Sequence, residues 1–294
     1  MSHKAAAERR AYRSLTFGAL LLGGVAIAFS PIFVRVAEVG PMASAFWRVA
    51  LAAPFLAAWS LWDRQKSEAG AARLAPIAAA GVCFACDLAF WHLSIVYTSV
   101  ANATLLSNFA PLFVTLGAWL LYRQRVTRSF LLAMAVAIAG AALLAGPNFS
   151  RGGTQFAGDM FGIVTAVFYG SYMLAIWRAR NTGATSRIMA MSTSITAVLL
   201  LPVALAFEPT LLPATSRGWL MLIGLALVCQ VAGQSLIAYA MAHLPASLSA
   251  LSLLIQPVCA AAYAWILLGE SISAMQFAGG AIVLAGIYLA RRSS

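Results

Sequence analysis

Ten stretches of predominantly apolar sequence, separated by short breaks with charged residues, proline or glycine, run through this 294-residue chain. A helix that crosses a bilayer needs about 20 such residues, so ten spans leave no room for a folded domain outside the membrane. The chain is 62% hydrophobic and 9% charged, whereas soluble domains carry roughly 25% charged residues. We therefore expect an all-α integral membrane protein. The expected spans are Leu15–Val36, Ala43–Trp62, Leu74–Tyr97, Val100–Tyr122, Phe130–Leu144, Gly158–Trp177, Ile188–Phe207, Trp219–Ala242, Ser247–Leu268 and Ala274–Leu289.

Positive charge falls almost entirely on one set of loops. Of 19 lysines and arginines, fifteen lie in the two tails and in alternate loops, and Arg151 and Arg217 stand clearly in the opposite loops. Cytoplasmic loops of membrane proteins carry this excess, so both termini are predicted to be cytoplasmic in a bacterial-type inner (plasma) membrane. The net charge of +11 thus reports orientation in a lipid bilayer, and no nucleic-acid partner is expected.

The sequence repeats itself at an offset of 146 residues. This shift aligns Pro111 with Pro257 and Ala118-Trp119 with Ala264-Trp265 without a gap. The chain therefore divides into two halves of five spans, and because five is odd, the second half enters the membrane inverted. Secondary transporters with inverted repeats bind cargo where the halves meet. The expected divisions are a cytoplasmic tail (1–14), a first repeat (15–144), a linker (145–157), a second repeat (158–289) and a cytoplasmic tail (290–294).

Short motifs resemble a known transporter family. Pro257 through Trp265 to Leu268-Gly269-Glu270, followed by Gln276, Gly279-Gly280 and Gly286, resembles the end of an EamA repeat in the drug/metabolite transporter (DMT) superfamily, as does Gly40-Pro41 with Phe46-Trp47-Arg48. Phe90-Trp91-His92 and Ser94-Ile95-Val96-Tyr97 are similar to amino-acid exporters of the YddG type. The resemblance implies export of small metabolites, above all aromatic or other apolar amino acids. Gln124 departs from the pattern, because the first copy more often has an acidic residue there.

Few ionisable residues lie inside the spans, and each is costly in hydrocarbon unless it is paired or faces a water-filled pathway. Asp87, in the middle of its span, is predicted either to accept a substrate ammonium group or a proton, or to pair internally with Arg48. His92 either binds a substrate carboxylate or makes a hydrogen bond between helices. Arg48 is expected to have a gating or structural role.

Uncharged polar residues form stripes with helical spacing. Thr104, Asn108, Pro111 and Thr115 share one helix face, and Ser252, Gln256, Cys259 and Tyr263 share another. Each stripe meets a proline, which is expected to free the carbonyl four residues earlier, at Ser107 or Leu253. These faces are predicted to line a shared cavity, with interhelical hydrogen bonding as the alternative. The candidate substrate-binding residues are Asn108, Gln256, His92, Asp87, Trp91, Tyr169, Tyr172, Gln230, Gln234 and Tyr263, with Pro111, Pro257 and Arg48 as gating or structural residues.

Other chemistries lack their motifs. The chain has no phosphate-binding loop, no His-Glu-x-x-His and no Gly-x-Ser-x-Gly, so we expect neither an enzyme nor a cofactor or metal site. Cys83 and Cys86 lie within one span without a second pair and are interpreted as packing residues. The predicted function is alternating-access export by a chain for which a monomer is sufficient. Alternatives are export of another small metabolite or a drug-like cation, and, less favoured, a membrane-embedded enzyme or receptor.

Overall fold

The structure is a computed structural model that describes residues 3–64, 74–98, 100–145, 153–181, 183–269 and 271–293. All regular elements in these ranges are helical. Ten segments are long and apolar enough to cross a membrane, which confirms the expected fold class. The third span, Leu74–Tyr97, has the expected bounds, and the fifth extends to Arg128–Ala145. Lys66, Arg73, Arg151, Glu270 and the middle of the expected linker lie outside the described residues.

The first half of the chain contains seven helices that make five spans. The first span consists of α1 and α2, and the fourth consists of α5 and α6. The helices are α1 (His3–Ile27), α2 (Ser30–Val36), α3 (Pro41–Arg64), α4 (Leu74–Tyr97), α5 (Val100–Ser107), α6 (Ala110–Tyr122) and α7 (Arg128–Ala145).

The second half repeats five spans. Its third span contains a π-helical segment, η1, and its fourth span is divided like the fourth span of the first half. The elements are α8 (Gly153–Arg180), α9 (Thr185–Phe207), α10 (Ser216–Gly224), η1 (Leu225–Gln234), α11 (Ser235–Met241), α12 (Ala246–Ser252), α13 (Ile255–Leu268) and α14 (Ala274–Ser293).

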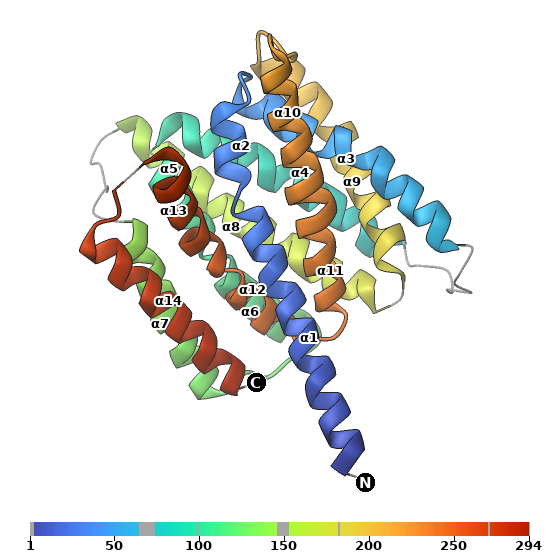
Figure 1. Ribbon diagram of the computed structural model, residues 1–294, viewed down its shortest axis with the longest axis vertical. Coiled ribbons are helices and arrows are strands. Elements are labelled where there is room, and N and C mark those ends of the chain that lie inside the picture. The colour runs from blue at the N-terminus through green and yellow to red at the C-terminus, as the bar shows by residue number, and fades with distance from the viewer. Residues whose placement is uncertain are drawn as a thin grey trace.

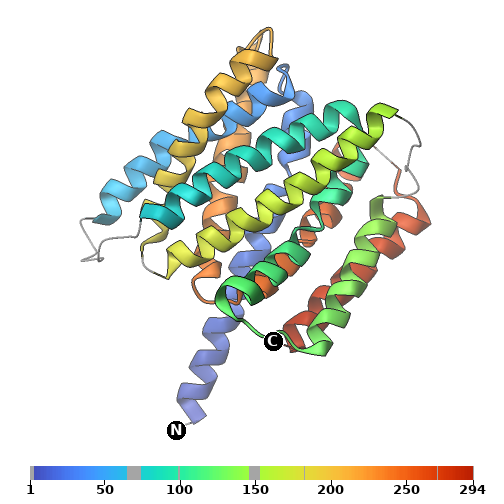
Figure 2. The same cartoon turned by 180° about the vertical axis from the view of Figure 1, so that it is seen from behind.

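The two halves are inverted and interleaved. The path from α5 to α6 descends in Figure 1, whereas the path from α12 to α13 ascends. The principal helix pairs join opposite halves, since α4 packs on α8, α3 on α9, α1 on η1 and α11, and α7 on α14. Figure 2 shows α7 and α14 side by side at one edge of the bundle. Each half therefore depends on the other for its packing.

Glycines bring α7 and α14 into backbone contact. A Cβ atom on Gly279 would lie 2.5 Å from the Leu144 nitrogen and 2.8 Å from the Gly140 oxygen. A Cβ on Gly286 would lie 2.6 Å from that of Ala137. Small residues allow such close approach in lipid, where helix association depends on packing rather than on the hydrophobic effect.

Three spans are broken near their middles. The breaks fall at Ala28-Phe29, at Asn108-Phe109 and at Leu253-Leu254. Proline follows each break within a few residues, at Pro31, Pro111 and Pro257, because a residue without an amide hydrogen cannot continue the hydrogen-bond ladder. The prediction of a free Leu253 carbonyl is wrong. This carbonyl accepts a 2.9 Å hydrogen bond from the backbone N–H of Gln256 in a tight turn.

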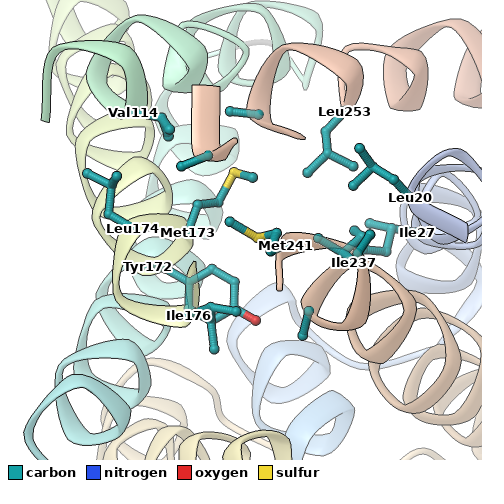
Figure 3. Packing of buried hydrophobic residues seen from close by; sticks show 14 of the residues in the cluster. Leu20, Ile27, Val114, Tyr172, Met173, Leu174, Ile176, Ile237, Met241 and Leu253 are labelled. Carbon is teal, nitrogen blue, oxygen red and sulfur yellow. The ribbon is translucent and has the colours of Figure 1, made fainter. Parts of the chain in front are cut away.

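Tightly packed apolar side chains fill the bundle on the terminus-bearing side of these breaks. Figure 3 shows Leu20 from α1, Val114 from α6, Met173 from α8, Met241 from α11 and Leu253, which caps α12, converging on one core. Leu20 and Val114 are fully buried. Leu20, Val114 and Met241 each lie between the break or the π-helix of their span and the membrane face where α1 begins.

The equivalent positions of the two repeats differ in burial. Ala110, Val114 and Ala118 are buried, whereas their partners at the 146-residue offset, including Ala260 and Ala264 in α13, are only half-buried. In the first repeat, α6 is the part of the fourth span nearer the termini, and it is tightly packed. Its counterpart in the second repeat, α13, lies toward the opposite membrane face and is packed less tightly. Equivalent positions of the two repeats thus share a sequence pattern but differ in how tightly they are packed.

Candidate functional site

One cavity lies where the broken spans of the two halves meet. Its volume is about 130 Å³, well above the ~10–15 Å³ that a single water molecule requires. Residues at or shortly after the three helix breaks contribute to it, together with α3, α4, α8 and the end of η1. The lining residues are Ile27, Ala28, Ser30, Pro31, Arg48, Phe84, Asp87, Leu88, Trp91, Thr104, Ser107, Asn108, Thr165, Tyr169, Gln234, Gln256, Pro257 and Ala260.

Arg48 enters the cavity from α3 and is held from two directions. Its Nε donates a 3.1 Å hydrogen bond to Gln230 Oε1, and its guanidinium carbon lies 5.5 Å from the centre of the Phe84 ring. Gln230 Nε2 in turn donates to Thr193 Oγ1 at 3.1 Å. The side chain of Arg48 is therefore fixed by α4, α9 and η1 together.

Asp87 lies on α4 and lines the same cavity. The alternative of an internal Asp87–Arg48 ion pair is not what the structure shows, because no ion pair within 4.0 Å joins them in the described part of the chain. Both side chains are 7% exposed. The site therefore contains one basic and one acidic side chain that are nine-tenths buried and are not joined by an ion pair among the described residues.

Uncharged polar groups complete the lining. Asn108, three residues before Pro111, and Gln256, directly before Pro257, both line the cavity. Gln256 Nε2 and Thr165 Oγ1 are buried and have no hydrogen-bond partner within 3.5 Å among the described residues, although the Gln256 side chain faces that of Tyr169. Unsatisfied buried donors cost about 1–3 kcal/mol each, so these two atoms are arranged for water or cargo. Tyr169, Trp91 and Gln234 also line the cavity.

Five of the predicted residues lie outside the lining. His92 Nδ1 contacts the Leu88 oxygen at 2.6 Å, Tyr172 donates to Gln234 Oε1 at 3.3 Å, and Gln230 holds Arg48. Tyr263 donates to the Val25 oxygen at 3.3 Å and stacks on Phe29 with ring centres 3.9 Å apart. Pro111 is buried at the start of α6. These residues support the cavity walls in this conformation.

The break in the first span was not predicted. It places Ala28, Ser30 and Pro31 in the cavity wall, and the Ser30-Pro31 pair is the sequence signal that indicates it, by the same logic that applies to Pro111 and Pro257. The π-helical segment η1, by contrast, contains no proline, and the glycines at its two ends, Gly224 and Gly233, did not predict it. Within the described ranges, no group of three or more His, Cys, Asp or Glu residues could hold a metal ion.

Comparison with known proteins identifies the family. The model of the EamA-like transporter family matches residues 15–146 and again residues 156–292. The chain belongs to this family. It is a multi-pass membrane transporter, not an enzyme, and the two matches correspond to its two halves. The resemblance of the motifs to EamA repeats is thus confirmed, whereas similarity to YddG-type exporters in specificity is not shown.

Relatives of this EamA-like transporter are also transporters. An uncharacterized transporter of Archaeoglobus fulgidus is 27% identical over 274 residues, covering 89% of this chain and 92% of the relative. The pseudopaline exporter CntI of Pseudomonas aeruginosa is 27% identical over 212 residues, covering 72% and 73%. One crystal structure superposes with a TM-score of 0.80 at 19% identity over 96% of this chain and 98% of that chain, which shows a shared fold.

Proposed function

We propose that this transporter exports amino acids, with aromatic or other apolar side chains, from the cytoplasm by alternating access. The single observation that carries the proposal is the central cavity, which is built from helix breaks of both halves and contains opposite charges beside aromatic walls. Broken helices at the interface of inverted repeats are the usual binding sites of secondary transporters. The proposed repeats are residues 15–144 and 158–289.

The cavity wall divides into polar and apolar parts. Asn108, Gln256 and Gln234 supply amide groups, whereas Phe84, Trp91 and Tyr169 supply aromatic surface. Aromatic side chains offer a large contact area to an apolar ligand group. A cargo with a polar head and an apolar side chain therefore matches this wall better than a uniformly polar metabolite does.

The proposed direction of transport rests on the distribution of positive residues and on the name of a related protein. Positive residues concentrate on the side of the termini, which favours a cytoplasmic location for that side. Leu20, Met173 and Met241 belong to the tightly packed apolar core of the bundle (Figure 3), and we propose that this core separates the cavity from that side. A relative bears the name of an exporter, which favours outward movement of a metabolite.

Transport into and out of liposomes tests the proposal. The purified full-length chain is reconstituted, and efflux of radiolabelled phenylalanine, tryptophan, leucine and threonine is measured with and without a pH gradient. We expect phenylalanine, tryptophan or leucine to leave faster than from protein-free liposomes, even without a gradient, because the cavity contains few ionisable groups. Equal rates in both kinds of liposome for all four amino acids would exclude the amino-acid substrate.

A drug-like cation is the second candidate cargo. The observation that favours it is Asp87, a carboxylate that lines the cavity without an ion-pair partner among the described residues. Ethidium efflux from the same liposomes distinguishes the two cargoes. Efflux of ethidium without efflux of any amino acid would replace the first proposal by this one.

A further inference from the structure

Arg48 retains binding capacity in the cavity. Its Nε is engaged by Gln230 Oε1, but neither of its two terminal nitrogens makes a hydrogen bond or ion pair to a described residue. Those terminal groups form a planar fork that matches the two oxygens of a carboxylate. Gln230 and Thr193 hold the guanidinium so that this fork is oriented before cargo arrives.

Asp87 provides the opposite charge nearby. The Arg48 guanidinium lies over the ring of Phe84, which precedes Asp87 by three residues on α4. Phe84 and Asp87 lie on the same side of α4, about 4.5 Å apart along its axis, and both line the cavity that Arg48 enters. Two opposite charges that served only to stabilise the fold would gain most from direct contact in the membrane interior, because each is costly there when unpaired.

We infer that Arg48 and Asp87 together form a receptor for a zwitterion, in which Arg48 binds the carboxylate and Asp87 binds the ammonium group of a free amino acid. Gln256 Nε2, a buried donor with no hydrogen-bond partner within 3.5 Å among the described residues, is placed to share the carboxylate. This inference rests on the proposed transport function and specifies the chemical group that the site selects. It also reassigns Arg48, which the sequence suggested as a gating or structural residue.

The charges of site and cargo cancel in this arrangement. Arg48 and Asp87 sum to zero, as do the two ends of an amino acid, so every charge in the loaded site has an opposite neighbour. An amine without a carboxylate leaves Arg48 unpaired, and a carboxylic acid without an amine leaves Asp87 unpaired. Each uncompensated buried charge is destabilising. The site therefore discriminates against both analogues even where their apolar part is identical.

Binding of three matched ligands tests the inference. The full-length protein in detergent is titrated with tritiated L-phenylalanine, and unlabelled phenethylamine and 3-phenylpropanoate serve as competitors that lack one charge each. We expect phenylalanine to bind about tenfold or more tightly than either analogue, since one charge-assisted hydrogen bond contributes about that factor. Comparable affinities for all three ligands would overturn the inference.

Two variants assign the charges. Asp87→Asn is expected to weaken phenylalanine binding about tenfold and to abolish discrimination against 3-phenylpropanoate. Arg48→Gln is expected to abolish discrimination against phenethylamine instead. Matched controls are Asp159→Asn, whose carboxylate accepts from Thr98 at 2.9 Å away from the cavity, and Arg217→Gln, which changes an exposed residue at the start of α10. Both controls should keep the wild-type selectivity.

The outcomes separate the inference from the function on which it rests. Unchanged selectivity in folded Asp87→Asn and Arg48→Gln variants would overturn the receptor while leaving amino-acid export intact. Absence of phenylalanine binding together with absence of amino-acid efflux would remove the proposed function itself. If either variant elutes as an aggregate, the selectivity of the wild-type protein among the three ligands decides the question, with Arg48→Lys as the charge-conserving variant at that position.

Discussion

Gln230 Oε1 accepts a 3.1 Å hydrogen bond from Arg48 Nε across 182 positions of the chain. The same amide donates to Thr193, so its oxygen and nitrogen are both used. Arg48 belongs to the first half, and Gln230 and Thr193 belong to the second. This contact connects the halves at the cavity wall and fixes the one arginine that enters the cavity within the described structure.

Replacing Gln230 should destabilise the folded transporter. Gln230→Leu leaves Arg48 Nε and Thr193 Oγ1 without their partner, and each lost interaction is expected to cost about 1–2 kcal/mol. Thr193→Val removes only the second bond and should have the smaller effect. Thermal unfolding in detergent measures both. A Gln230→Leu midpoint equal to that of the wild type would show that the contact contributes nothing to stability.

The cavity amides should matter for transport rather than for folding. Asn108→Ala and Gln256→Ala each remove a lining group beside a helix break, and transport should fall by about three- to tenfold if each amide makes one hydrogen bond to cargo. Cys259→Ala, on α13 but outside the lining, is the matched control. Efflux from liposomes reports the rate, and extraction in detergent reports folding. Efflux at the wild-type rate in both variants would show that the two amides do not bind cargo and would favour interhelical hydrogen bonding instead.

Sequence patterns predicted the spans and part of the site. The apolar length of Leu74–Tyr97 defined that helix, because in lipid a span must be helical to satisfy its backbone. The expectation that Pro111 and Pro257 interrupt their helices led to the prediction that Asn108 and Gln256 face one cavity, and both residues line the cavity of the structure. The same expectation applies to Pro31, but the break in the first span was not predicted from it. Helical spacing located the faces of polar residues, but it did not say which neighbour each face meets.

Side-chain roles depended on contacts between distant segments. Tyr169 and Tyr172 are three residues apart on α8 and share a face, yet Tyr169 lines the cavity while Tyr172 is buried against Gln234. The π-helical η1 changes the phase of Gln230 and Gln234 relative to an α-helix. Arg48 could not be assigned from sequence, since its partner depends on this phase and on the packing of α3 against η1.

Adjacent glycines in α14 offer a sharp test of helix packing. Gly279→Ala forces a Cβ to within 2.5 Å of the Leu144 backbone, whereas the nearest atom to a Cβ on Gly280 is 3.5 Å away. Gly279→Ala should separate α7 from α14 and cost about 1–3 kcal/mol, and Gly280→Ala should be tolerated. The unfolding midpoint of each variant checks this. Equal midpoints would contradict the backbone contact between these helices.

His243, in the loop between α11 and α12, should respond to pH. Partial burial, and secondarily the nearby positive charge of Arg180, lower the pKa of His243 below its usual 6.5. Its ring contacts Tyr12 at 3.2 Å and packs against Tyr239. Because the folded protein disfavours the proton, stability contributed by neutral His243 is present above pH 6.5 and is lost as the pH falls from there toward the lowered pKa.

Hydrogen exchange near the start of α1 measures this effect. We expect faster exchange around Tyr12 as the pH is lowered below 6.5, after correction for the intrinsic rate, because the positive ring is repelled by Arg180. His243→Gln keeps a polar side chain without a titrating group and should flatten the response. A pH response of the same size in His243→Gln would assign it to another group.

Cysteine accessibility should reveal the exchange of packing states between the repeats. Val114 in α6 is fully buried, whereas its repeat partner, Ala260 in α13, is half-buried and lines the cavity. In a background without the four native cysteines, Ala260→Cys should react readily with a water-soluble thiol reagent in this conformation and Val114→Cys should be protected.

Rocking of the halves requires the reverse pattern when the cavity opens toward the termini. Addition of amino-acid substrate on that side should therefore increase labelling at position 114 and decrease it at position 260. Labelling that stays unchanged at both positions while efflux proceeds would contradict alternating access, because cargo would then pass without exchange of the two packing states.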